Sequence, residues 1–543
     1  MRIRWCAPMA VQTACMVLGI VTPCLAQAMP GIIPQPVKMA IQDGHFHISS
    51  DTRVAASGDA RQETTKLIDF LAPAMGLRLA LLDQPTPDSN LIQLLLVSPP
   101  DNTLGEEGYE LQVTPQSIRI RANKPAGLFN AIQSLRQLLP PAIFSPQKAE
   151  QTQWSVPCVR ITDAPRFGWR GLLIDPARHF IPVQDVKHFL DTMAIHKFNR
   201  LQIHLTDDCG WRIEIRKHPE LTQIGSRMDF TEMQSAAPAA ANSRFGGFYT
   251  QEDIRDLVRY AARLHIMLIP EIEMPAHTGA AIVSCPQLGL YPQKLAALSS
   301  DQRWKAHEWV LAPRPESVAF MSEVLAEVME LFPSPYIHIG GDEANIVHWK
   351  QSDEMQDLIR QLGLKDETEL HSWFIRQLDA FLTRHGRRLV GWDEILQGGL
   401  APGAVVMSWR GQEGGITAAK AGHAVVMAPT SHTYFDFYQG PAASEPRAIG
   451  GDLPLEKVFV FEPIPPVLDA GQAKLILGGQ GQLWGEFIPN PKHRDYMAYP
   501  RAAALAEILW SPKADRTIEQ FLPRLKDHLK RLDAAQVHYR PLK

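Results

Sequence analysis

Beyond Pro165 the chain alternates between two hydrophobic patterns. Short runs of apolar, often β-branched residues are followed by longer segments whose apolar residues recur at helical spacing. This alternation predicts parallel strands joined by crossover helices. The candidate strands lie at residues 171–175, 200–205, 266–271, 336–340, 388–392, 404–408, 424–428 and 475–483. Eight such strands favour the α/β fold of a closed (β/α)8 TIM barrel over an open doubly wound sheet.

Residues 29–157 show a mixed α+β pattern instead. Segments 61–71 and 126–139 have helical spacing, 91–97 is an apolar strand, and 109–114 and 117–122 alternate around a turn. The proline-rich stretch 140–157 predicts a linker. We therefore predict a small α+β domain over residues 29–157 and a barrel over residues 158–543 that ends in an outer helix at 518–532.

The first residues have the pattern of an export signal. Arg2 and Arg4 precede an apolar stretch at residues 10–21, and the small residues at 25–28 suit a signal peptidase. The apolar stretch is interrupted and too short to span a bilayer comfortably. Residues 1–28 are thus predicted to be a cleaved signal peptide, and the mature protein is expected to be periplasmic or secreted, without a membrane anchor.

The charge balance gives no electrostatic reason to expect nucleic acid binding. The formal net charge is −4, from 54 basic and 58 acidic residues, and no basic run is present. Beyond the signal the cysteines are Cys158, Cys209 and Cys285, so at most one disulfide can form within the chain. No glycine-rich nucleotide loop follows the first barrel strand. The composition suits a large exported enzyme, and no cofactor is predicted.

Segment 336–345 carries the strongest chemical signal in the chain. Its apolar run ends in Gly340 and Gly341 and then presents two adjacent carboxylates, Asp342 and Glu343. Acidic residues at the end of a strand match the C-terminal rim of a parallel barrel, where catalytic groups lie. Two carboxylates that share a pocket disfavour each other's ionisation, so one is expected to stay protonated near neutral pH. Helix capping would explain one carboxylate but not both.

Other polar and aromatic residues follow the remaining strands. They are Asp175, Arg178, His179, His204, Asp207, Asp208, Glu271, Glu273, His277, Trp392, Asp393, Glu394, Trp409, Tyr434, Asp436, Trp484 and Glu486. Each has a structural alternative, such as an ion pair between Arg178 and Asp175 or a tryptophan buried in the core. Their joint position at strand ends favours a ligand site. Charged groups that bind hydroxyls, together with indole faces that stack on rings, predict a pyranose ligand.

The motif formed by residues 338–343, His-Ile-Gly-Gly-Asp-Glu, resembles the signature of the family 20 glycoside hydrolases, the β-N-acetylhexosaminidases. The resemblance implies a small N-terminal domain in front of the barrel. It also implies that Asp342 orients and polarises the 2-acetamido group of the substrate and that Glu343 is the general acid/base. Tyr434 is similar to the tyrosine that donates to the acetamide oxygen.

The same resemblance assigns the residues around the acidic pair. It implies that Arg178 binds sugar hydroxyls, that Asp436 and Glu486 hold the outer hydroxyls, and that Trp392, Trp409 and Trp484 are aromatic walls. Asp207 and His277 resemble the residues that lie behind Glu343 and tune it, with adjacent Asp208 as the alternative to Asp207. Asp393 departs from the pattern, because many relatives have Gln there, and this bears on substrate preference more than on chemistry.

In this family the acetamide oxygen of the substrate is the nucleophile, so two consecutive carboxylates can act without a separate enzyme nucleophile. The resemblance implies a retaining, substrate-assisted, exo-acting β-N-acetylhexosaminidase that releases terminal N-acetylglucosamine or N-acetylgalactosamine from amino-sugar oligosaccharides or glycoconjugates. No metal is predicted for it. Two alternatives stay open. One is a carbohydrate-binding barrel without activity, and the other is a barrel metallohydrolase that uses His204, Asp207, Glu273, His277 and His338.

Overall fold

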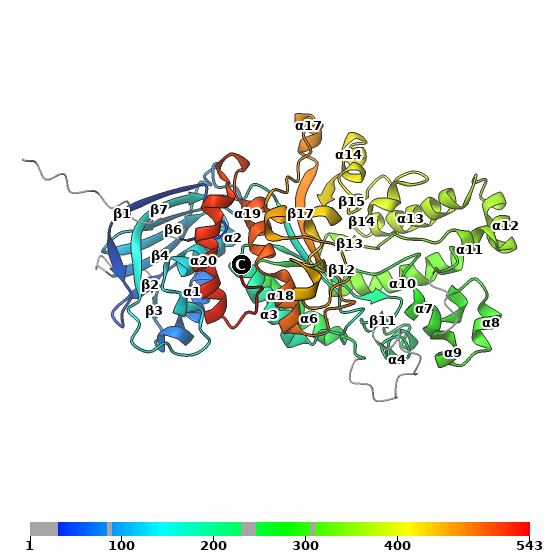
Figure 1. The fold of residues 1–543 in the computed structure, drawn as a ribbon, viewed down its shortest axis with the longest axis horizontal. Helices are drawn as coiled ribbons and strands as arrows, with labels where there is room; N and C mark the ends of the chain where they lie inside the picture. Colours follow the sequence, from blue (N-terminus) through cyan, green and yellow to red (C-terminus); the bar gives the residue numbers. More distant parts are fainter. Residues whose placement is uncertain (1–30, 84–89, 229, 231–245, 305–309, 543) are drawn as a thin grey trace, which may run out of the picture.

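A sheet domain and a barrel lie side by side in the protein, the first drawn mainly in blue and cyan and the second mainly in green to orange (Figure 1). The computed structural model describes residues 31–83, 90–228, 230, 246–304 and 310–542. The predicted signal peptide, residues 1–28, lies outside these described residues. Within them, no helix has the length and apolar character needed to cross a membrane. Cys158, Cys209 and Cys285 are buried and unpaired.

Eight parallel strands close into a barrel in the order β12-β13-β14-β15-β16-β17-β8-β9. They are β8 (Trp169–Ile174), β9 (Arg200–His204), β12 (Met267–Glu271), β13 (Tyr336–His338), β14 (Arg388–Trp392), β15 (Val405–Ser408), β16 (Val425–Met427) and β17 (Ile476–Leu483). Every predicted barrel strand is present, and the predicted fold class is confirmed. Because all neighbours are parallel, the C-terminal ends of the strands meet at one rim.

Helices cover the outside of the barrel, and further short helices lie in the connections between its strands. The longer ones are α3 (Val183–Ile195), α6 (Gln251–Arg263), α10 (Pro315–Leu331), α12 (Asp353–Gln361), α13 (Glu367–Arg384), α14 (Glu413–Lys420), α18 (Pro491–Ala498), α19 (Arg501–Trp510) and the C-terminal α20 (Ile518–Ala534). Shorter segments are β10 (Thr206–Asp207), β11 (Gly210–Trp211), α4 (Glu220–Gln223), α7 (Gly279–Ser284), η2 (Pro286–Leu288), α8 (Pro292–Ala296), α9 (Ser300–Trp304), α11 (Val347–Lys350), α15 (Thr430–Thr433), η4 (Ala442–Ser444), α16 (Leu455–Phe459), α17 (Ala470–Ala473) and η5 (Lys513–Asp515). A single turn, η3 (Asp393–Leu396), follows β14 directly and contacts both β14 and β15.

The barrel interior is a packed core. Apolar side chains of successive strands meet there, among them Ile269, Val390, Val405, Met407 and Val426. Polar side chains also lie in the interior, and they are hydrogen-bonded to one another. Gln202 donates to Oε2 of Glu271 at 2.8 Å and accepts from Gln480 at 2.7 Å. These polar residues lead to the end of β12, where the rim begins.

The N-terminal domain is built on a seven-stranded mixed sheet of order β1-β7-β5-β6-β4-β2-β3. Its strands are β1 (Lys38–His47), β2 (Arg53–Ala55), β3 (Ala80–Leu82), β4 (Leu91–Leu96), β5 (Tyr109–Val113), β6 (Ser117–Ala122) and β7 (Ser155–Asp163). Helices α1 (Ala60–Met75) and α2 (Pro125–Leu138) pack on the sheet through a second apolar core. The elements predicted here are present, but β1, β2, β3 and β7 come in addition to them.

The predicted domain boundary between residues 157 and 158 is wrong, because it cuts through β7. This strand pairs with β1 on one side and with β5 on the other, so the N-terminal sheet continues to Asp163. Pro157, which suggested a linker, lies where β7 pairs with β1 alone, next to an irregularity in β1. The predicted linker also contains η1 (Pro141–Phe144), which contacts α20.

A buried polar junction joins the two domains. Asp163 accepts hydrogen bonds from Lys197 at 3.1 Å and from the indole of Trp510 at 2.9 Å. Helix α20, drawn in red, runs between the sheet domain and the barrel (Figure 1). Its Arg531 donates to the backbone oxygen of Gln137 in α2. The predicted outer helix is therefore a bridge between the domains.

Two buried histidines at this junction predict that the protein loses stability in acid. Nε2 of His528 lies 2.8 Å from Nε2 of His196, whose Nδ1 contacts the backbone oxygen of Thr192. Burial lowers the pKa of His196 to about 4. The unfolded chain therefore takes up protons below its ordinary histidine pKa while the folded chain does not. We expect stability to fall by about 3 kcal/mol as the pH drops from 6.5 to 4 for one such histidine.

Urea unfolding at several pH values between 7.5 and 4.5 measures this loss. His528→Gln keeps an N–H donor for His196 and removes one titrating ring, so its unfolding free energy should depend less on pH than that of the wild type. Equal pH slopes for the two proteins would contradict the prediction.

Candidate active site

A pocket of about 240 Å³ lies at the C-terminal ends of the barrel strands. Its lining consists of Arg178, His204, His277, Asp342, Glu343, Trp392, Trp409, Thr430, Tyr434, Asp436, Phe437, Ile449, Trp484 and Glu486. Of the residues to which the family resemblance gave a role, all except Asp207 belong to this set, whereas the strand-end residues Asp175, His179, Asp208, Glu271, Glu273, Asp393 and Glu394 do not line the pocket. Asp207 lies directly behind it, with Oδ2 2.8 Å from Nη2 of Arg178. The fold thus gathers residues from the whole barrel sequence into one cavity.

The turn after β13 explains why two glycines precede the acidic pair. Gly340 and Gly341 have φ values of 68° and 87°, which suit glycine. A Cβ atom on Gly340 would overlap Oε2 of Glu273, so no side chain fits there. Glu343 itself has a φ of 46°, which is uncommon for a residue with a side chain. This tight backbone brings both Asp342 and Glu343 to the pocket.

His277 connects the acidic pair to the residues behind it. Nε2 of His277 lies 3.3 Å from Oε2 of Glu343 and 3.6 Å from Oδ2 of Asp342. Nδ1 lies 3.2 Å from Oδ2 of Asp208 and 3.7 Å from Oδ2 of Asp207. The direct hydrogen bond behind His277 is therefore made by Asp208. Asp207, the residue named from the sequence, is turned toward Arg178 instead.

The positive charge on His277 bears on the expectation that one carboxyl of the acidic pair stays protonated near neutral pH. Burial opposes a charged imidazole, but Asp207, Asp208 and the acidic pair outweigh burial and raise the pKa of His277 well above its ordinary value. The hydrogen bond from His277 in turn lowers the pKa of Glu343. The sequence predicted that repulsion between neighbours keeps one carboxylate protonated. The imidazole beside both carboxylates counteracts that repulsion, so the pKa of Glu343 is shifted toward its ionised form.

Two carboxylates hold Arg178 in place. Nη1 lies 3.0 Å from Oδ2 of Asp175, and Nη2 lies 2.8 Å from Oδ2 of Asp207. The guanidinium stacks over Trp484, 5.2 Å from the ring centroid, and Nη2 lies 4.0 Å from Oε1 of Glu486. The structural alternative, a pair with Asp175, is thus present, yet Arg178 also lines the pocket. A fixed guanidinium fork of this kind suits the binding of hydroxyl groups.

The aromatic walls are anchored by hydrogen bonds. Trp392 donates from Nε1 to Oε1 of Glu271 at 3.0 Å, and Trp409 donates from Nε1 to Oε2 of Glu394 at 2.9 Å. The ring of Tyr434 lies face to face with Trp409, with centroids 6.2 Å apart and an interplanar angle of 23°. Because these rings cannot rotate freely, they can enclose a flat amide or a sugar ring.

Two carboxylates at the pocket each have a buried oxygen without a hydrogen-bond partner among the described residues. These oxygens are Oδ1 of Asp436 and Oε2 of Glu486. Burial raises the pKa of Asp436 and of Glu486. A sugar hydroxyl is a donor that would satisfy such an oxygen. These two positions therefore suit the recognition of hydroxyls, as the sequence predicted.

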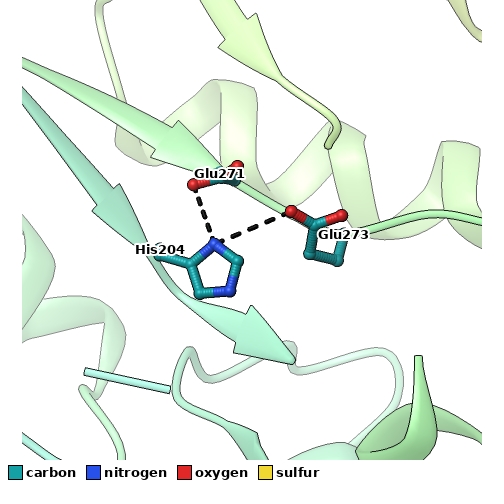
Figure 2. Close-up of side chains that lie close together, drawn as sticks. All are labelled: His204, Glu271 and Glu273. Atoms are coloured by element: carbon teal, nitrogen blue, oxygen red, sulfur yellow. Dashed lines mark ion pairs between the residues drawn. The ribbon is translucent and has the colours of Figure 1, made fainter. Parts of the chain in front are cut away.

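His204, which lines the pocket, forms a buried cluster with Glu271 and Glu273. Figure 2 shows these three side chains together. Nδ1 of His204 lies 2.8 Å from Oε2 of Glu271 and 3.7 Å from Oε1 of Glu273. Its Nε2 contacts Asp207 at 2.9 Å, and Asp207 also pairs with Arg178. A metal ion held by the alternative ligand set would have to break these ion pairs. The contacts therefore favour a network that supports the rim over a hydrolytic metal site.

Three lining residues, Thr430, Phe437 and Ile449, were not predicted from the sequence. Thr430 follows a predicted strand, so its position alone could have identified it. Phe437 and Ile449 lie in the long connection between β16 and β17 and carry neither charge nor motif. Nothing in the sequence distinguishes them from other surface residues.

The sequence profile of "Glycosyl hydrolase family 20, catalytic domain" matches residues 167–513, and that of "Glycosyl hydrolase family 20, domain 2" matches residues 29–164. The chain belongs to glycosyl hydrolase family 20. It is therefore a glycoside hydrolase with a second domain in front of its catalytic barrel. The domain 2 match ends directly after β7, in agreement with the place of this strand in the N-terminal sheet.

Named relatives of this family 20 hydrolase include two bacterial proteins. A beta-hexosaminidase of Porphyromonas gingivalis is 41% identical over 511 residues, which cover 94% of this chain and 64% of that protein. This chain therefore spans less than two thirds of that relative. A beta-hexosaminidase of Vibrio furnissii is 35% identical, over 89% of this chain and 77% of its own length.

Solved structures share the whole fold of this family 20 hydrolase. An exo β-N-acetylglucosaminidase from Vibrio harveyi, in complex with N-acetylglucosamine, has a TM-score of 0.81 at 33% identity and covers 94% of this chain and 78% of its own. A mutant Streptomyces plicatus β-hexosaminidase in complex with its product GlcNAc has a TM-score of 0.81 at 28% identity, with coverage of 94% and 97%.

Proposed function

We propose that this family 20 hydrolase is an exo-acting β-N-acetylhexosaminidase. It removes terminal, non-reducing N-acetylglucosamine or N-acetylgalactosamine from amino-sugar oligosaccharides or glycoconjugates. One observation carries the proposal: Asp342 and Glu343 lie together beside His277, at a pocket walled by fixed indole and phenol rings. The names of the similar proteins, which are β-hexosaminidases, support it.

In the proposed reaction the acetamide oxygen of the bound sugar attacks the anomeric carbon. Glu343 gives its proton to the glycosidic oxygen as the bond to the leaving group breaks. This step yields a free alcohol and a cyclic oxazolinium ion. Glu343, now ionised, takes a proton from the water that adds to the anomeric carbon and reopens the ring. Two inversions at that carbon retain its configuration.

The other residues of the pocket prepare the acetamide for this attack. The carboxylate of Asp342 accepts the amide N–H and balances the positive charge that develops on the nitrogen. Tyr434 donates its hydroxyl proton to the acetamide oxygen, which holds that oxygen near the anomeric carbon. Burial, followed by the charge of Asp436, raises the pKa of Tyr434 well above its ordinary value, so the donor proton is retained.

The lowered pKa of Glu343 is compatible with its role as the general acid. Its side chain is 58% exposed, so a leaving group bound above the pocket would cover it and exclude water. Loss of solvent raises the pKa of a carboxyl group. His277, which contacts both Glu343 and Asp342, is positioned to supply the proton at that moment.

The pocket size supports an exo mode of action. Its volume of about 240 Å³ is below that of a typical site for drug-sized ligands, about 300–1,000 Å³. Arg178, Asp436 and Glu486 line it as well, where they can bind the outer hydroxyls of a terminal sugar. One sugar ring, and not a continuing chain, fits such a site.

A thiazoline analogue of the cyclic intermediate is expected to inhibit the enzyme competitively and to bind at least about 100 times more tightly than N-acetylglucosamine. The analogue has the bicyclic shape of the intermediate, and its protonated ring nitrogen carries the charge that Asp342 balances, whereas the amide nitrogen of the product is neutral. Inhibition kinetics with a chromogenic N-acetyl-β-glucosaminide measures this ratio.

The matched substrate control is the corresponding β-glucoside, which has no acetamide. It should not be hydrolysed at a measurable rate, because the nucleophile is missing. Equal rates on both substrates, or no protection by the thiazoline, would argue for an enzyme-bound covalent intermediate. Binding of N-acetylglucosamine without turnover of either substrate would instead support the alternative of a carbohydrate-binding barrel.

We also propose that residues 1–28 direct export and are removed, so that the enzyme acts in the periplasm or outside the cell. Basic residues, an apolar stretch and small residues at 25–28 support this. Mass determination of the protein isolated from its host should give a chain that begins near residue 29. An intact N-terminus in the cytosolic fraction would overturn it.

A further inference from the structure

The adjacent acids Asp393 and Glu394, which form the start of η3 after β14, have no part in the proposed reaction. Both are buried, with exposed fractions of 1% and 9%, and neither lines the pocket. Buried carboxylates carry a large desolvation cost, so their partners indicate what they stabilise. The side-chain hydrogen bonds of both acids lead to the same short segment, residues 408–410 at the end of β15, which contains Trp409.

These two acids hold Trp409 by its backbone and by its ring. Oδ2 of Asp393 accepts from the backbone N–H of Trp409 at 3.1 Å and from that of Arg410 at 3.3 Å. Oδ1 of Asp393 accepts from Nε of Arg410 at 2.6 Å. Glu394 makes the contact to the ring, because its Oε2 accepts from Nε1 of Trp409 at 2.9 Å. Asp393 therefore fixes the main chain, and Glu394 fixes the rotation of the indole.

The orientation of this indole determines the space between two walls of the pocket. Trp409 lies parallel to Tyr434, the residue that contacts the acetamide oxygen in the proposed function. Trp409 and Tyr434 line the same pocket as Asp342, the acid that accepts the amide N–H in the proposed function. The wall that Glu394 fixes therefore belongs to the part of the pocket that receives the N-acyl group.

We propose that Glu394 is a positioning residue that sets the acyl-group selectivity of the enzyme, because its hydrogen bond to Trp409 keeps the pocket too narrow for acyl groups larger than acetyl. This inference rests on the proposed function. Without the bond the indole can turn about its side-chain torsions, and the pocket can admit another methylene. Glu394 acts through Trp409 and does not touch the substrate.

The test compares two chromogenic β-glucosaminides that differ only in the N-acyl group, acetyl or propionyl. In Glu394→Leu the ratio of the two kcat/KM values, acetyl over propionyl, should fall about tenfold relative to the wild type, the effect of about 1.4 kcal/mol of differential binding. Glu394→Gln is the matched control, because its side-chain oxygen can still accept the indole proton. Its ratio should stay within about twofold of the wild type.

A loss of folded protein cannot produce this result, because it lowers both rates equally and leaves the ratio unchanged. Trp409→Phe is the second variant, since it removes the N–H donor and leaves Glu394 in place. Adding Glu394→Leu to Trp409→Phe should cause no further change in the ratio if the two residues act through one bond.

An unchanged ratio in Glu394→Leu, or a full further change in the double variant, would overturn the role of Glu394. Failure of the proposed function looks different. In that case the wild-type enzyme itself would not hydrolyse the N-acetyl substrate, whatever residue occupies position 394.

Discussion

Glu343→Gln is expected to lower kcat for alkyl N-acetyl-β-glucosaminides by about 10²- to 10⁴-fold, the usual contribution of a positioned general acid. Glutamine has nearly the same shape and can still contact His277, but it cannot give a proton to the glycosidic oxygen. The loss should be smallest for glycosides of acidic phenols, because these leaving groups need little protonation. Steady-state kinetics over a series of leaving groups measures the effect.

The exposed Glu354 offers a control outside the pocket. Its side chain is 55% exposed and pairs with Arg314, so Glu354→Gln should leave kcat unchanged. If Glu343→Gln lost the same factor for every leaving group, another residue would have to supply the proton.

Asp342→Asn is expected to lower kcat by about 10²- to 10³-fold with a smaller change in KM. The amide of asparagine can keep the contact to the acetamide N–H through its oxygen. It carries no charge, however, and so cannot balance the positive nitrogen of the cyclic intermediate. Because this charge develops only as the ring forms, the loss should be found in kcat. Kinetics of the wild type and the variant on one alkyl glycoside separate the two parameters.

The thiazoline analogue gives an independent measure of the same interaction. Its affinity should fall in Asp342→Asn by a factor similar to the loss in kcat, while the affinity for N-acetylglucosamine should change little. A loss confined to KM would mean that Asp342 binds the substrate and the transition state equally.

The barrel could be predicted from the sequence because each strand is a short apolar run between clear helix and turn signals. Residues 388–392 are an example, since the strand β14 (Arg388–Trp392) has the predicted bounds. The N-terminal sheet was harder to predict from the sequence. β7 contains Pro157, and a proline usually marks a linker or an edge. Its pairing with β1 and β5 depends on partners far away in the sequence, which local patterns do not reveal.

The pocket could be predicted because catalytic groups of a parallel barrel follow the ends of its strands. This rule and the family resemblance identified Arg178, Asp342, Tyr434 and Trp484, among others, as lining residues. The rule does not show in which direction each side chain points. Only the fold shows that, of two adjacent aspartates, it is Asp208 that makes the hydrogen bond to His277.

The pKa of Glu343 could not be predicted for a related reason. The sequence shows that Asp342 is adjacent to Glu343, and adjacency alone predicts repulsion between the two charges. His277 comes from a different loop, after β12, and only its position beside both carboxylates reverses the direction of the shift. A pKa depends on spatial neighbours, and this one is 66 positions away in the printed sequence.

The most direct test uses substrates whose own amide oxygen has been weakened. Replacing the acetyl group by mono-, di- and trifluoroacetyl withdraws electrons from that oxygen, and the N-propionyl substrate controls for size. If the amide oxygen attacks the anomeric carbon, kcat/KM must fall with each added fluorine, far more than size accounts for. Rates that are the same across the fluorinated series would contradict the account, because the attacking atom would then belong to the enzyme or to water.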